Sequence, residues 1–204
     1  MKTIKVIALG ALLACQNGVF AHVVLEQQTA SVGESYRAVF RVSHGCDGLP
    51  TTGITVQIPP GVQGAKPMPK AGWTLTVRKE KLATPYTSHG KLITEDVAEI
   101  TWTASSPEAA LPEAFYDEFI LRAGLPASAG PLWFKVIQDC KVGDKTGRNA
   151  WTQVPAEGVS TKGLKSPAAL LQVQGKAAEA HQLQQAAQPR DLKYNYQQPE
   201  EVEQ

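Results

Sequence analysis

The chain has 204 residues, which suits one domain with a sizeable core plus terminal extensions. Its formal net charge is +1, and without Lys2 and Lys5 of the first 21 residues it becomes −1, with 18 basic against 19 acidic side chains. A near-neutral chain without a basic stripe gives no reason to expect nucleic acid or an anionic membrane as a partner.

The first 21 residues predict a signal peptide. A positive start (MKTIK) precedes an apolar run (VIALGALLA) that is too short to span a bilayer, and Val19-Phe20-Ala21 provides a cleavage site before His22. The alternative is a lipoprotein, because Leu12-Leu13-Ala14-Cys15 resembles a lipobox in which Cys15 is lipidated and begins the mature chain. No other segment could span a membrane. We therefore expect a secreted or periplasmic protein.

Residues 30 to 155 alternate between apolar and polar side chains with a period of two. In 35–42, for example, Tyr36, Ala38, Phe40 and Val42 share one face. The same alternation occurs at 54–58, 73–78 and 98–103, and further strands are expected at 115–123, 132–139, 150–154 and 168–174. Short strands separated by Pro and Gly turns, without a long helical pattern, predict an all-β protein, an antiparallel β-sandwich over residues 22–175.

Residues 176–204 differ in composition from the rest of the chain. They are rich in Gln, Ala and Glu and contain almost no large aliphatic side chains, so we expect a disordered tail in which His181 is incidental. With Cys15 in the leader, the cysteines that remain are Cys46 and Cys140. In an oxidising compartment such a pair forms a disulfide by default, and the alternative is a thiolate pair that binds a soft metal such as Cu(I).

His22 is a candidate metal ligand if cleavage follows Ala21. It then offers an α-amine and an imidazole Nδ1, which together close a six-membered chelate ring. Both groups lose their protons near neutral pH, and two nitrogens with open coordination positions suit Cu(II). The alternative is that His22 is merely the residue with which a cleaved chain begins.

Two further residues could contribute to such a site. His44 lies in a turn after a strand and is a plausible second ligand if Cys46 is bridged, although a lone loop histidine is more often a surface residue. Trp151 follows a glycine-rich, charged loop expected at 141–149, so it could shield a site near a strand end, whereas the other tryptophans are expected in the core. His89, in a Ser-His-Gly sequence, is expected to be a polar turn residue and not a ligand. No hydrolase, zinc-protease or nucleotide motif is present, so we expect no enzyme.

The ordered set of these residues resembles the YcnI-like family of secreted copper-binding domains over residues 22 to 174. The matching segments are the Ala21-His22-Val-Val-Leu start, Phe40-Arg-Val42, Pro50-Thr-Thr52, Lys70-Ala-Gly72-Trp73, Tyr116-Asp-Glu-Phe119, Trp133-Phe with Gln138, and Trp151. The resemblance implies an immunoglobulin-like sandwich that holds Cu(II) through the amine and imidazole of the N-terminal histidine, a glutamate oxygen and a covering tryptophan. These roles fall on His22 and Trp151.

The family's glutamate has no counterpart here. Where it belongs, after Phe-Arg-Val, this chain has Ser43-His44-Gly45-Cys46-Asp47, so His44 or Asp47 is expected to supply the missing ligand, with His44 favoured. The resemblance thus implies a copper chaperone or sequestration protein that passes Cu(II) to an acceptor protein. The alternatives are a copper oxidase of the histidine-brace type and a metal-free adhesion or scaffolding sandwich.

Overall fold

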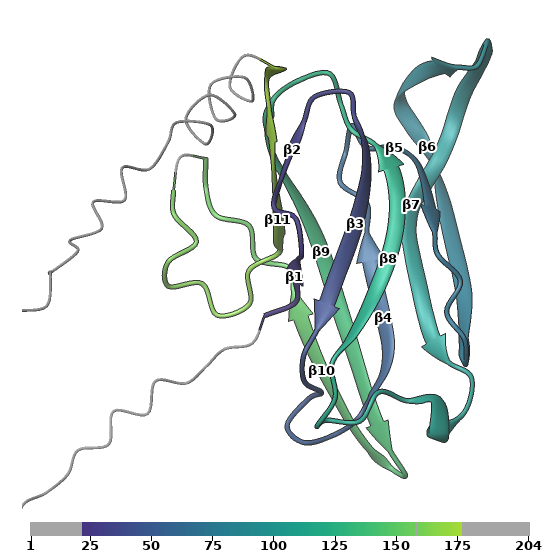
Figure 1. Ribbon diagram of the computed structural model, residues 1–204, viewed down its shortest axis with the longest axis vertical. Helices are drawn as coiled ribbons and strands as arrows, with labels where there is room; N and C mark the ends of the chain where they lie inside the picture. The colour runs from purple at the N-terminus through teal and green to yellow at the C-terminus, as the bar shows by residue number, and fades with distance from the viewer. Residues whose placement is uncertain (1–21, 158, 177–204) are drawn as a thin grey trace, which may run out of the picture.

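The computed structural model describes residues 22–157 and 159–176, which form two β-sheets and a single 3-10 turn, η1 (Pro107–Ala109) (Figure 1). The strands are β1 (Val24–Leu25), β2 (Thr29–Ser31), β3 (Ser35–Val42), β4 (Thr51–Gln57), β5 (Gln63–Pro67), β6 (Trp73–Ser88), β7 (Lys91–Ala104), β8 (Asp117–Gly124), β9 (Gly130–Val142), β10 (Lys145–Trp151) and β11 (Ala169–Gln174). The predicted signal peptide and all but the first residue of the predicted tail lie outside the described residues. None of the described helices is long and apolar enough to cross a membrane.

The strands form a four-stranded and a seven-stranded sheet. The order in the smaller sheet is β1-β3-β8-β5, and the order in the larger is β2-β11-β9-β4-β7-β6, with β10 paired to β9. The pairings within the sheets are antiparallel except for β11 with β2. The two sheets pack face to face, which confirms the predicted all-β sandwich (Figure 1).

The alternating residues of the sequence supply the core between the sheets. In β3, Tyr36, Ala38, Phe40 and Val42 are buried, while the arginines between them are exposed. Aromatic rings meet edge to face across the core, with centroids 5.5 Å apart for Phe40–Phe134 and 5.8 Å apart for Trp102–Phe119. Each fully buried side chain of this size contributes roughly 1.5–3 kcal/mol, so the core is the main source of stability.

Two hairpins are longer than predicted. Segment 141–149, expected as a loop, instead continues β9 and starts β10, with Val142 paired to Lys145 around a turn at Gly143. Strands β6 and β7 likewise extend to Ser88 and from Lys91, and the hairpin projects past the sandwich at the upper right of Figure 1. Side chains on both faces of these segments are largely exposed, so no alternation marked them in the sequence.

Candidate metal site at the N-terminal histidine

The structure places His22 and His44 against the same indole, that of Trp151. The ring centroids of His22 and Trp151 are 5.2 Å apart at an interplanar angle of 78°, and those of His44 and Trp151 are 6.3 Å apart at 83°. Trp151 is 6% exposed and is the last residue of β10, whose arrowhead lies near β1 and the end of β3 in Figure 1. Three of the predicted site residues therefore come together where these three strands approach one another.

His22 is held in place by the residues that follow it. Val23 and Leu25 are 3% and 1% exposed, and Leu25 is the register partner of Phe40, so β1 is fixed to β3 immediately after His22. The Nε2 atom of His22 is buried, and the side chain lines a pocket of about 190 Å³ together with Gln28 and Thr161.

The disulfide between Cys46 and Cys140 is present, which confirms that prediction and fixes the loop that carries His44. The Cα atoms of the two cysteines are 5.8 Å apart, and 94 residues of sequence separate them. Cys46 and Leu49 exchange two backbone hydrogen bonds of 3.1 and 3.0 Å around Asp47 and Gly48. Both turn residues have positive φ, 50° and 83°, which is the signature of a type I′ turn and of an Asp-Gly sequence.

Asp47 therefore lies at the exposed tip of this turn, where aspartate tolerates the positive φ that the turn requires. In the described part of the chain, no three His, Cys, Asp or Glu side chains are grouped so that they could hold a metal ion. Asp47 is thus not gathered with the two histidines. His89 lies in a second turn of the same kind, with φ of 48° followed by Gly90 at 75°, as its Ser-His-Gly sequence predicted.

Two hydrogen bonds hold the backbone around His44. The buried Gln138 amide donates from Nε2 to the His44 carbonyl at 2.6 Å and to Thr51 Oγ1 at 2.7 Å. The Gly45 amide donates to Glu113 Oε2 at 2.6 Å, although Glu113 is 68 residues away in sequence. The sequence did not mark Glu113 for this role. A glutamine within the apolar β9, by contrast, was a visible signal that a buried polar group needs partners.

The imidazole of His44 lies 2.6 Å from the carbonyl oxygen of Gly45 through Nδ1. A carbonyl only accepts hydrogen bonds, so this contact requires the proton on Nδ1 and leaves the lone pair on Nε2. Histidines that bind metals are usually held in this way, with one ring nitrogen donating to a carbonyl or carboxylate and the other facing the ion. In its neutral form, His44 therefore has a ring nitrogen arrangement that such histidines also have.

Trp151 carries an unsatisfied polar group at the same place. Its Nε1 is buried, and the described residues offer it no hydrogen-bond partner. A buried donor without an acceptor costs about 1–3 kcal/mol, so natural proteins usually supply one, often as water or a ligand. His22 and His44 both pack against this indole, which also belongs to the core cluster between the sheets.

The comparisons with known proteins agree with this fold. A family model described as a domain of unknown function, DUF1775, matches residues 22–173. The chain is similar to an uncharacterized protein from Nocardia farcinica whose crystal structure has an immunoglobulin-like fold, with 25% identity, a TM-score of 0.56, and 74% of this chain and 97% of that chain covered.

A weaker similarity is to a type II cohesin domain from the cellulosome of Acetivibrio cellulolyticus, with 14% identity and a TM-score of 0.30 over 62% of this chain and 92% of that domain. That score is too low to inform on this protein. A comparison with curated proteins found no match. Since the family model spans nearly the whole sandwich, the protein belongs to the DUF1775 family, the YcnI family that its sequence resembles.

Proposed function

We propose that this protein is an exported Cu(II)-binding protein that sequesters the ion or passes it to an acceptor protein. His22, once it is the first residue, would bind through its α-amine and Nδ1, His44 would bind through Nε2, and Trp151 would limit access of water. The observation that supports this most is that the imidazoles of His22 and His44 contact the same buried indole, that of Trp151. His22 is also the residue directly after the predicted cleavage site.

The chemistry of the donor set favours copper. Cu(II) leads the divalent affinity order and accepts tetragonal sites built from nitrogen and oxygen. A chelate that takes two nitrogens from one residue needs only one further side-chain ligand, here His44. Because Cu(II) binds the amine and the imidazole only in their deprotonated forms, uptake of Cu(II) would release protons and weaken as the pH falls.

The test compares two proteins that differ by one residue. A protein that begins at His22 is expected to bind about one equivalent of Cu(II), and a protein that retains Ala21 is expected to bind at least about tenfold more weakly, because its α-amine is then an amide. His44→Ala should also weaken binding, and His89→Ala serves as the matched control because His89 lies on a distant hairpin turn. Equal affinity of the two proteins would refute the chelate.

Mass spectrometry of the exported protein tests the premise separately. We expect a chain that begins at His22. A lipid on Cys15 would leave His22 inside the chain and would favour a metal-free role.

A copper oxidase is the second candidate, and one surface feature favours it. Phe115 and Tyr116 are 63% and 61% exposed, and they follow the Glu113 that holds the His44 loop. Exposed aromatic rings near the end of the segment that holds the His44 loop could bind a flat substrate such as a polysaccharide. The copper-loaded protein with a reductant should then produce peroxide or oxidised sugars, and its failure to do so leaves the binding protein as the function.

A further inference from the structure

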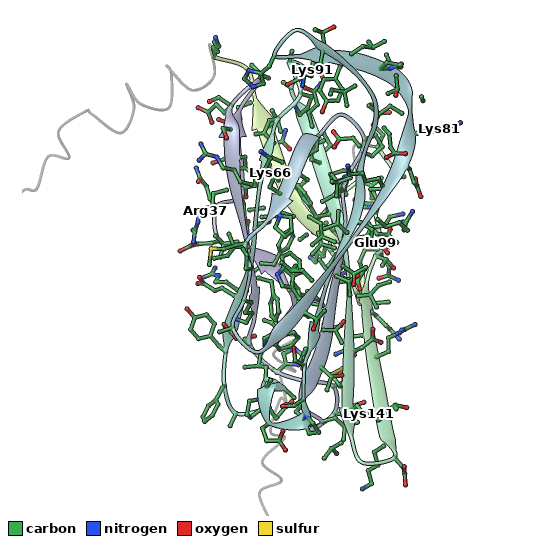
Figure 2. The ribbon with its side chains drawn as sticks, turned by 90° about the vertical axis from the view of Figure 1, so that its right-hand side faces the viewer. Arg37, Lys66, Lys81, Lys91, Glu99 and Lys141 are labelled. Atoms are coloured by element: carbon green, nitrogen blue, oxygen red, sulfur yellow. A yellow bond between two sulfur atoms is a disulfide. The ribbon has the colours of Figure 1, made fainter. Side chains whose placement is uncertain are left out.

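Three cations stand in cross-strand register on the outer face of the smaller sheet. Arg37 of β3 is paired with Arg122 of β8, and Arg122 is paired with Lys66 of β5. We call these three residues the cation row. They are exposed, and Figure 2 shows Arg37 and Lys66 on the same side of the molecule. They are far apart in the sequence, so neither composition nor motif revealed them.

The like charges of the cation row repel one another and destabilise the sheet. Directly opposed side chains on neighbouring strands lie about 5 Å apart at Cβ, and like charges at that spacing destabilise a sheet. The ion pairs of the described residues are formed by Lys70, Arg78 and Arg148, and none includes a member of the row. Four residues further along the same strand pair, Arg41 instead faces Glu118, so the fold does place opposite charges elsewhere on this face.

The row lines a groove with a partly apolar floor. The groove has a volume of about 590 Å³, and its lining also includes Ser35, Met68 and Ile120. Arg122 donates from Nε to Ser35 Oγ at 2.7 Å, which anchors its guanidinium group at the groove wall. Met68 is 52% exposed beside the buried Ile120, so a carbon skeleton can rest next to the charges. The volume lies within the range of small-molecule sites.

We propose that this groove is a binding site for a small ligand that carries a phosphate group. A carboxylate would neutralise one of the three charges, whereas a phosphate monoester carries close to two negative charges and three acceptor oxygens. Guanidinium groups match phosphate oxygens in pairs, and the ammonium group adds a point charge. The proposal is independent of the copper site, because its residues are separate from His22, His44 and Trp151.

The test is a titration of the full mature chain with inorganic phosphate and with phenyl phosphate, followed by amide NMR at constant ionic strength. Constant ionic strength is needed because salt screens exposed charges. We expect saturable shifts around the groove, at least about tenfold weaker binding in Arg122→Gln, and no change in the control Lys91→Gln on the β6–β7 hairpin. Tighter binding of phenyl phosphate would identify a phosphate ester as the ligand, and equal binding would identify free phosphate.

A second measurement separates ligand binding from folding. Because the row repels itself, Arg122→Gln should unfold at a higher temperature than the wild type without phosphate, and phosphate should stabilise only the wild type. Unsaturable shifts, or equal phosphate binding by Arg122→Gln, would overturn the proposal.

Discussion

Replacing Gln138 by Leu tests how the His44 loop is held. The side chain is fully buried, and its amide donates to the His44 carbonyl at 2.6 Å and to Thr51 Oγ1 at 2.7 Å. Leucine has a similar volume, so the substitution opens little cavity and the loss comes from the polar partners. Each buried group that is left unsatisfied costs about 1–3 kcal/mol, and burying leucine recovers part of this, so we expect a net loss of about 2–4 kcal/mol in the free energy of unfolding.

Urea unfolding monitored by tryptophan fluorescence measures this loss. The matched control is Gln172→Leu, the same substitution at an exposed position of β11, which should stay within about 0.5 kcal/mol of the wild type. Thr51→Val removes one of the two acceptors and should cost less than Gln138→Leu. If Gln138→Leu changes stability no more than Gln172→Leu, the buried amide does not hold the loop and the reasoning is wrong.

Four further outcomes are expected. Reduction of the disulfide in urea should lower the free energy of unfolding by about 4–5 kcal/mol, because 94 residues separate its ends; a loss below about 1 kcal/mol would contradict the loop-closure explanation. Gly45→Ala should cost more than about 2 kcal/mol, since an added Cβ would lie 1.8 Å from the Leu49 carbonyl oxygen, whereas Gly124→Ala, with its nearest contact at 3.6 Å, should cost far less in the same assay. Burial disfavours the ionised form of Asp96, but hydrogen bonds from two backbone amides and a tyrosine hydroxyl outweigh burial and lower the pKa of this carboxyl. The stability that Asp96 contributes should therefore be fully present above about pH 4 and be lost as the pH falls through the folded pKa. Asp96→Asn should flatten this pH dependence in urea unfolding, and an equal loss of stability in the variant would assign the dependence to other groups. If copper binds at the proposed site, Trp151→Phe should remove most of the fluorescence quenching by Cu(II), and undiminished quenching would place the ion elsewhere.

The sequence revealed the strands that have one face in the core. The strand predicted over 35–42 coincides with β3, because its alternate residues are buried. The outer parts of β6 and β7 escaped prediction, since the hairpin exposes both faces and no period of two is needed there. The short strands β1, β2 and β5 have too few residues to show a period, and they form because longer neighbours offer them hydrogen-bonding edges.

The sequence predicted which residues belong to the candidate site, but it did not predict that they lie close together. His22, His44 and Trp151 were recognised from residue type and from the resemblance, and the structure brings them into contact. Their proximity depends on the register that pairs Trp151 with Val136 and on a disulfide that closes 94 residues, neither of which leaves a local signal. The hydrogen bond from Gly45 to Glu113 has the same origin, because 68 residues separate its partners.

The role of the α-amine of His22 is the central claim of the copper proposal, and blocking that amine tests it most directly. An α-amine is ordinarily less basic than a lysine side chain, so it can be acetylated selectively near neutral pH. Electron paramagnetic resonance of the protein loaded with one equivalent of Cu(II) should show a tetragonal ion coupled to nitrogen, and acetylation should abolish this spectrum. An unchanged spectrum after acetylation would contradict the proposed site.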